Sequence, residues 1–182
     1  MSNPLDNYRQ LTARIDELCG AITASLGEQI TCSPGCSSCC TSITIFPVEA
    51  AALREELYNL PDSQADEIRR HVAEHATGER CPLLSLHHCL LYRARPIICR
   101  THGLPIIYTT EEGRSSDCCP LNLSGAEAVS GAHVVDIDKL NTLLVAVNSI
   151  FLSQTGHPDT ATRVTIAEAL TSLKETKSRS RD

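Results

Sequence analysis

Residues 32–40 read CSPGCSSCC and place four thiols within nine residues. Thiols so closely spaced either bind a metal or form disulfides. The Pro34-Gly35 step predicts a turn in which Cys32 and Cys36 converge. Nine of the ten cysteines lie between residues 32 and 119, and the flanking segments are nearly free of them. The rest of the chain is therefore predicted to bring more thiols to this loop.

The composition narrows the class of protein. A chain of 182 residues is typical of one domain that buries a core without disulfide support. The net charge of -6 and the few scattered aromatic residues argue against a nucleic-acid surface. The N-terminal residues MSNPLD include neither a basic segment nor an apolar run, so no signal peptide is expected, and no apolar run is long enough to span a membrane. We therefore expect a cytoplasmic protein, in which reduced thiols favour metal or redox chemistry over structural bridges.

Apolar residues recur at helical spacing outside the cysteine-rich segment. Pro4 and Pro47 suit the first position of a helix, and Gly78 suits the end of one. Cys19 falls on the apolar stripe of the first helix and is interpreted as a buried core residue. Helices are predicted over residues 3–28, 47–60, from 62 or 63 to 76, from 136 or 138 to 154, and from 159 or 160 onward.

The cysteine-rich middle of the chain lacks long periodic segments. Short strands are predicted within residues 42–46 and 104–110, with a turn at 111–113, and residues 79–122 are otherwise irregular. The predicted fold is mainly α, with amphipathic helices flanking an irregular cysteine-rich metal-binding core and at most a small β element. Residues 1–176 are expected to form one domain around a core at 32–119, followed by a frayed tail at 177–182.

Thiolates prefer zinc, copper(I) or the iron of iron–sulfur clusters, and four of them complete a tetrahedral zinc site or hold a [4Fe–4S] cluster. Adjacent side chains in an extended segment point to opposite faces. Cys39 and Cys40, and likewise Cys118 and Cys119, are therefore expected to send one thiol to a first site and the other to a second site or the core. Proline follows Cys81 and Cys119, as it follows the last cysteine of a ferredoxin run, which slightly favours iron–sulfur. Zinc or iron, and one site or two, both stay open.

Residues 81–84 read CPLL, and residues 89–100 read CLLYRARPIICR, a C-x2-Y-x2-R-P-x2-C-R segment. With the loop at 32–40 and a late cysteine, these motifs resemble the CxxCxxCC cysteine-cluster family over residues 32–119. The chain departs from the family in its first spacing, C-x3-C where C-x2-C is usual, and in offering two late cysteines where the family has one. The resemblance implies zinc or iron chelation by the following residues: Cys32, Cys36, Cys39, Cys40, Cys81, Cys89, Cys99 and either Cys118 or Cys119.

Positively charged residues accompany these thiols. Guanidinium groups offset the net negative charge of a thiolate site, and Arg95 and Arg100 flank Cys99 closely. The resemblance adds Tyr92 to this supporting set. We therefore expect Tyr92, Arg95 and Arg100 to surround the ligands without binding the metal themselves.

Other constellations point to different chemistry. Residues 71–75 read HVAEH, the inverted zinc-protease pattern, although polar residues on an outer helical face also explain it. His87, His88 and His102 are either additional ligands or loop residues. Cys99, beside arginine and histidine, has the surroundings of a nucleophile, but a thiolate that shares a metal is not free to attack.

These observations predict a cysteine-cluster protein that chelates iron, as an iron–sulfur cluster, or zinc. The alternatives are an iron–sulfur-dependent enzyme of redox or methyl transfer and a metal storage or delivery protein. The metal ion is the expected partner. The sequence names neither a substrate nor a protein partner.

Overall fold

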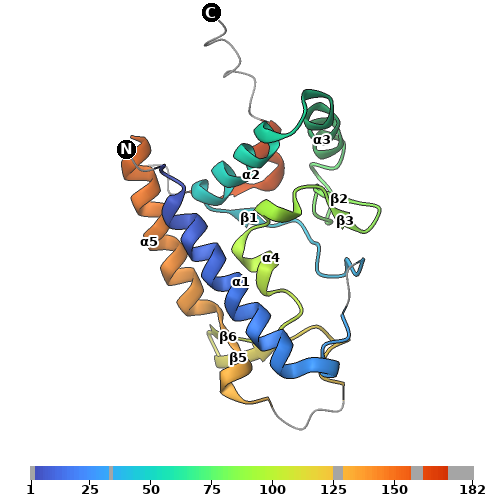
Figure 1. Ribbon diagram of the computed structural model, residues 1–182, viewed down its shortest axis with the longest axis vertical. Coiled ribbons are helices and arrows are strands. Elements are labelled where there is room, and N and C mark those ends of the chain that lie inside the picture. The colour runs from blue at the N-terminus through green and yellow to red at the C-terminus, as the bar shows by residue number, and fades with distance from the viewer. Residues whose placement is uncertain (1–2, 33–34, 125–128, 157–161, 172–182) are drawn as a thin grey trace, which may run out of the picture.

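The computed structural model describes residues 3–32, 35–124, 129–156 and 162–171. Two long helices, α1 (Asp6–Leu26) and α5 (Ile137–Thr155), lie side by side and antiparallel along one side of the molecule (Figure 1). The inner face of α1 buries the periodic apolar residues that predicted it, including Ile15 and Ile22, each 2% exposed. Cys19 is buried on the same face, which confirms its interpretation as a core residue.

Local sequence signals set the ends of α5. The side chain of Asp136 accepts a hydrogen bond from the backbone N–H of Lys139 at 3.1 Å, and so caps the helix N-terminus. Gly156 ends the helix in the left-handed conformation, with φ at 76°. Of the two caps predicted for this helix, Asp136 is therefore the one used.

The remaining long helices surround a second hydrophobic core. Helix α2 (Pro47–Asn59) has proline at its first turn, and α3 (Asp62–Glu74) follows after two residues. Both pack against the short helix α6 (Ile166–Thr171). The core that they share contains Leu53, Leu57 and Leu170, each 0% exposed. The helices predicted from 47 and 62 are confirmed, whereas residues 159 and 160, the predicted start of the last helix, lie outside the described residues, as does the tail.

Three small sheets complete the described fold. Strand β1 (Thr44–Ile45) pairs antiparallel with β7 (Val164–Thr165), and β2 (Leu84–Ser85) forms a hairpin with β3 (His88–Cys89). In the third sheet β4 (Ile106–Thr110) lies between an antiparallel β5 (Gly113–Asp117) and a parallel β6 (Val135–Asp136). The 3-10 segments are Gly27–Gln29, Tyr92–Ala94 and Gly131–His133.

The prediction of a mainly α fold is confirmed, but its β structure is spread over three sheets and not confined to one small element. Strand β5 was not predicted because its sequence, GRSSD, is polar and mostly exposed, without the alternation typical of a strand. It forms because it pairs residue by residue with the more apolar β4, from Ile106 with Asp117 to Thr110 with Gly113.

One buried carboxylate on α2 binds the backbone of a segment distant in the sequence. Glu49 on α2 is 2% exposed and accepts hydrogen bonds from the backbone N–H groups of Phe46 and Ile97, at 2.9 and 3.0 Å. The second of these contacts holds the first residue of the short helix α4 (Ile97–Thr101) against α2. Since α4 carries Cys99, this buried contact positions one of the predicted ligands.

In the part of the chain that the structure describes, no helix is long and apolar enough to cross a membrane.

Candidate metal centre

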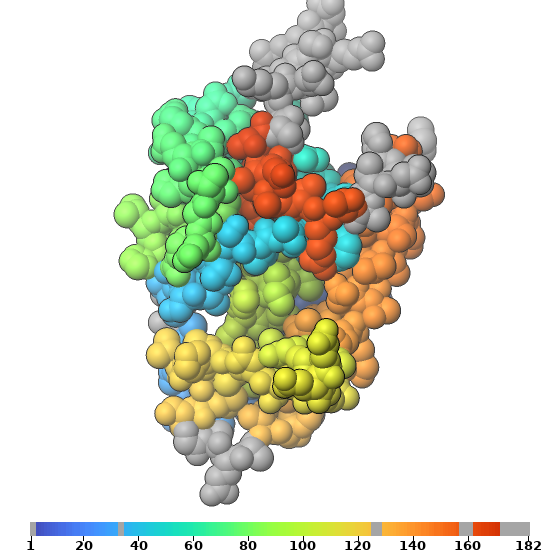
Figure 2. Space-filling model, turned by 180° about the vertical axis from the view of Figure 1, so that it is seen from behind, coloured from blue at the N-terminus to red at the C-terminus, as the bar shows by residue number. Residues whose placement is uncertain are grey.

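The segment after the first cysteines lies along residues 79–81. Thr41 and Arg80 form an antiparallel bridge, and the N–H of Ser42 donates to the carbonyl of Glu79 at 2.8 Å. The N–H of Cys81 donates to the carbonyl of Cys40 at 3.1 Å. Figure 2 shows the light-blue residues after the loop adjoining the green segment around residue 80. Two cysteines 41 positions apart are thus neighbours in the fold.

The β2–β3 hairpin carries the next thiol. Cys89 pairs with Leu84, and the N–H of Leu84 donates to the carbonyl of Cys81 at 3.0 Å. At the tip, Leu86 and His87 adopt positive φ values of 46° and 66°, the conformation that a tight two-residue hairpin requires. Cys81 and Cys89 are partly buried and pack against the same hydrophobic core. The hairpin therefore presents both thiols from its base.

Cys99 on α4 completes a group of four thiols. Burial, together with the neighbouring sulfurs of Cys81, Cys89 and Cys40, raises the pKa of Cys99 to about 12. Burial likewise raises the pKa of Cys40, and the sulfur of Cys81 adds to that rise. The same holds for Cys81, where burial is reinforced by the sulfur of Cys89. Four thiols from separate segments thus lie within electrostatic reach of one another.

Arg80 holds the loop beside this group. One nitrogen of its guanidinium donates to the carbonyl and the hydroxyl of Ser37, at 2.7 and 3.0 Å. Ser37 is 7% exposed, and its hydroxyl also lies 3.2 Å from Nδ1 of His87 at the hairpin tip. Sequence reasoning missed Arg80, because its partner Ser37 lies 43 positions earlier in the chain and no local pattern links the two residues.

A second group of thiols forms around Asn122, which is 4% exposed. Its Oδ1 accepts hydrogen bonds from the N–H groups of Thr31 and Cys32, at 2.9 and 2.8 Å, and its Nδ2 donates to the carbonyl of Gly103 at 2.5 Å. Its own N–H donates to the carbonyl of Cys119 at 2.8 Å. The side chain and the backbone of Asn122 therefore join Cys32 to Cys119. Sequence reasoning did not identify this asparagine.

Cys36 belongs to this second group. Burial raises the pKa of Cys32, and a hydrogen bond with Cys36 and the sulfur of Cys119 raise it further. Hydrogen bonds with the backbone and hydroxyl of Ser38 lower the pKa of Cys36, whose sulfur lies 3.8 Å from that hydroxyl. The predicted approach of Cys32 to Cys36 is thus present, whereas Pro34 of the predicted turn lies outside the described residues.

Cys39 and Cys118, the remaining members of the two adjacent Cys-Cys pairs, lie at the edges of these two groups. Cys39 is exposed, although its neighbour Cys40 lies beside Cys81. The thiol of Cys118 donates to the carbonyl of Cys119 at 3.6 Å, and its N–H donates to Asp117. The nine predicted ligands are therefore divided as follows: Cys40, Cys81, Cys89 and Cys99 together; Cys32, Cys36 and Cys119 together; Cys39 and Cys118 at the edges.

The chemistry of this donor set suits zinc or iron. All ten cysteines are free thiols, and sulfur is the ligand that these metals and iron–sulfur clusters prefer. Among the described residues, however, no group of three or more His, Cys, Asp or Glu side chains is arranged so that it could hold a metal ion as it stands. The thiols fit zinc or iron in kind and number.

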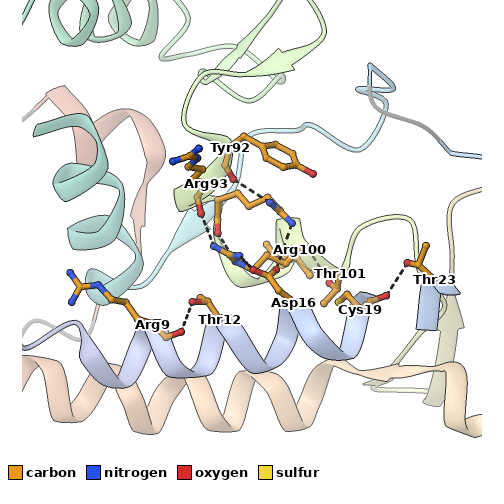
Figure 3. A network of polar contacts seen from close by, with 11 residues as sticks. Arg9, Thr12, Asp16, Cys19, Thr23, Tyr92, Arg93, Arg100 and Thr101 are labelled. Carbon is orange, nitrogen blue, oxygen red and sulfur yellow. Dashed lines mark hydrogen bonds and ion pairs between the residues drawn. The ribbon is translucent and has the colours of Figure 1, made fainter. Parts of the chain in front are cut away.

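The predicted supporting residues form their own network (Figure 3). Arg100 has a side chain only 6% exposed, and it donates to the carbonyls of Arg95 and Arg93 at 3.0 and 2.9 Å. Both Arg95 and Arg100 pair with Asp16 on α1, and the guanidinium of Arg95 lies 4.1 Å from the ring centre of Tyr92. These contacts fix the segment between Cys89 and Cys99.

The positive charge of Arg95 in this network acts on the thiol of Cys89. Burial raises the pKa of Cys89, and the charge of Arg95 opposes that rise. A polar cavity of about 370 Å³ lies beside the network, between α1, α4 and the loop that carries Cys32. Its lining includes Asp16, Cys32, Arg95, Arg100 and His102. A larger cavity of about 490 Å³ between β1, α4 and α5 has no cysteine in its lining.

The two histidines of the inverted protease pattern form hydrogen bonds with backbone carbonyl groups. Nε2 of His71 lies 3.0 Å from the carbonyl of Leu84, and Nδ1 of His75 lies 2.8 Å from the carbonyl of His71. Their rings lie against each other, with centres 4.2 Å apart. These contacts support the alternative that sequence analysis already offered, a polar helical face. His102 lines the polar cavity, where burial lowers its pKa.

The cysteine-rich segment matches a known protein family. Residues 31–120 match the model of the CxxCxxCC family, described as a "putative zinc- or iron-chelating domain". Searches of the curated proteins and of the solved structures find no match to the chain. The matched residues carry both thiol groups, the β2–β3 hairpin and the arginine network. The chain is therefore a member of the CxxCxxCC family through residues 31–120, a domain described by zinc or iron chelation.

Proposed function

We propose that this protein chelates zinc or iron through its central cysteines, with iron held as an iron–sulfur cluster. The observation that carries the proposal is the group of Cys40, Cys81, Cys89 and Cys99. Four separate segments supply its thiols, none is bridged, and each is partly buried. Four thiolates are the number that completes a zinc site or binds a [4Fe–4S] cluster.

Metal binding in this group is coupled to proton release. Burial raises the pKa of all four thiols, so each is protonated at neutral pH before a metal arrives. These four thiols would hold the cation as thiolates and would release their protons on binding, because only the thiolate is a strong ligand. Arg80 and Arg95 offset part of the negative charge that then develops.

The experiment that tests the proposal is purification without oxygen, followed by measurement of zinc, iron and acid-labile sulfide per chain. Iron and sulfide in near-equal amounts, with a brown colour, are expected for an iron–sulfur protein. Zinc alone in a colourless sample would support chelation and exclude the cluster. A protein that carries neither metal and takes up neither from solution would overturn the proposal.

An enzymatic role is the second candidate, and the polar cavity beside Cys32 favours it. The cavity holds two guanidinium groups and one carboxylate next to a thiol of the proposed metal-binding set. A small charged molecule in this space would lie close to a metal held by Cys32. Redox or methyl transfer at an iron–sulfur cluster requires such access, and a spectroscopic change of the bound cluster on addition of a small methyl donor would support it.

Metal storage or delivery is the third candidate. Cys39 is exposed, and the thiols do not converge into a formed cage in the described residues. An exposed thiol such as Cys39 can be reached by an acceptor of the metal. Rapid transfer of zinc to a chelator would favour this role, and retention over hours would oppose it. In each case the metal ion is the proposed partner, in a reducing cytoplasm and without nucleic acid.

A further inference from the structure

The central thiols are held together by two different parts of the backbone. We infer that they form two separate metal sites, a four-thiol site of Cys40, Cys81, Cys89 and Cys99 and a three-thiol site of Cys32, Cys36 and Cys119. This inference rests on the proposed function and says how the ligands are shared out. The sequence alone left open whether the cysteines form one metal site or two.

The four-thiol site is built on the hydrophobic core that α2, α3 and α6 share. Cys81 is hydrogen-bonded through its backbone to Cys40, and the hairpin register sets Cys89 opposite Leu84, whose own N–H binds the carbonyl of Cys81. The fourth thiol, Cys99, is carried by α4, which Glu49 holds against α2. All of these contacts come from residues 40–99, so this site needs nothing from the late cysteines.

The three-thiol site is built on Asn122. Its side chain binds the N–H of Cys32, and its backbone N–H binds the carbonyl of Cys119. The N–H of Leu123 also donates to the carbonyl of Gln29 at 2.8 Å, so the two segments are joined twice. Cys36 lies against Cys32, and the two thiols are hydrogen-bonded to each other.

A turn separates the two sites. The N–H of Cys40 donates to the carbonyl of Ser37 at 3.0 Å, and Arg80 holds that same carbonyl. Cys36 lies before this turn and Cys40 at its end. Cys36 therefore belongs with Cys32, and the exposed Cys39 lies between the sites.

The two sites differ in what completes them. Four thiolates saturate a tetrahedral ion, whereas three leave one position for a water or a small external ligand. Cys32 lines the polar cavity of about 370 Å³, so that open position is reachable by small molecules. The metal of the three-thiol site is therefore the one that exchanges, and a chelator will remove it first.

Zinc titration of the reduced full-length protein, with metal counted per chain, tests this division. We expect two zinc ions in the wild type, one in the double variant Cys81→Ser/Cys99→Ser, which leaves only two thiols in the four-thiol site, one in Cys119→Ser, and none tightly bound in the triple variant. Cys19→Ala, which removes a buried cysteine outside both sites, should keep two. Circular dichroism checks that each variant is folded, and Cys36→Ser replaces Cys119→Ser if the latter is not.

The outcomes separate the two claims. One zinc ion in the wild type, lost equally in Cys81→Ser/Cys99→Ser and in Cys36→Ser, would overturn the division and leave chelation standing. No zinc or iron in the wild type would contradict the proposed function itself. A two-step removal by chelator, with the first step absent in Cys36→Ser and Cys119→Ser, is the result that the division predicts.

Discussion

The backbone N–H of Cys81 donates a hydrogen bond to the carbonyl of Cys40 at 3.1 Å. This contact places the end of the CSPGCSSCC loop beside the Cys-Pro step that opens the β2–β3 hairpin. Because it joins backbone to backbone, it positions both thiols without using either side chain. The sulfurs remain available to a metal, and the group that they form with Cys89 and Cys99 is the basis of the proposed function.

Asn122→Ala should weaken both the fold and the three-thiol site. The substitution leaves the N–H groups of Thr31 and Cys32 and the carbonyl of Gly103 without their partner. Unsatisfied buried groups cost about 1–3 kcal/mol each, with part of that recovered by water. We expect the free energy of unfolding in urea to fall by about 2 kcal/mol, and one of two zinc ions to be lost.

The matched control is Asn59→Ala at the exposed end of α2, which should change neither stability nor zinc content appreciably. Equal stability of Asn122→Ala and wild type would show that Asn122 does not hold the two segments together.

Arg100→Lys should loosen the segment between Cys89 and Cys99. Lysine keeps the charge but lacks the fork that binds the carbonyls of Arg93 and Arg95 together with Asp16. We expect a loss of about 1–2 kcal/mol in the free energy of unfolding, from two or more lost hydrogen bonds. Zinc affinity of the four-thiol site should weaken as well, by competition with a chelator.

Arg93→Lys is the control, because its side chain is exposed and only its carbonyl is used in this network. If both lysine variants behave alike, the guanidinium of Arg100 has no positioning role.

The cysteines of the reduced, metal-free protein should differ in their rates of alkylation. Burial and neighbouring sulfurs raise the pKa of Cys99 to about 12, whereas hydrogen bonds with Ser38 lower the pKa of Cys36. The thiolate is the nucleophile, so iodoacetamide at pH 7.5 should modify Cys36 at least about 100-fold faster than Cys99. Peptide mass spectrometry follows both sites, and Ser38→Ala should slow Cys36 alone. Comparable rates at the two cysteines would contradict these environments.

Stability of the metal-free protein should fall in alkali. Cys99 has a pKa of about 12 in the folded protein, above its ordinary value of 9.0. Below pH 9 the thiol is protonated in both states. Above pH 9 it ionises only in the unfolded chain, so the free energy of unfolding decreases with rising pH by up to about 1.4 kcal/mol per unit for this thiol.

Urea unfolding between pH 8 and 10.5 measures the effect, with Cys99→Ala as the variant that lacks this contribution. The wild-type curve should be steeper than that of Cys99→Ala. Parallel curves would mean that Cys99 ionises as readily in the folded protein as in the unfolded one. Zinc-loaded protein should not show this decline through Cys99, because its thiolate is already formed.

Sequence was sufficient where local chemistry decides structure. Pro47 opens α2 and Asp136 caps α5, and these signals act within one helical turn. Strand β5 was missed because a polar segment forms a strand only through its partner, β4. The predicted burial of Cys19 followed from helical spacing alone, and it is confirmed.

The arrangement of the candidate site could not be read in the same way. Asn122 contacts residues 91 and 90 positions earlier in the chain, and Arg80 contacts Ser37 across 43 positions. No local pattern distinguishes these two residues from other asparagines and arginines. Motif spacing therefore predicts which cysteines are candidate ligands, and only the fold shows which of them lie together.

The most direct test of the central claim is X-ray absorption at the metal edge of the protein purified without oxygen. The account predicts a first shell of sulfur, at about 2.3 Å if the metal is zinc. Cys40→Ser should lower the sulfur count, whereas Cys19→Ala should leave it unchanged. A first shell made only of nitrogen and oxygen at about 2.0–2.1 Å would contradict chelation by the cysteine clusters.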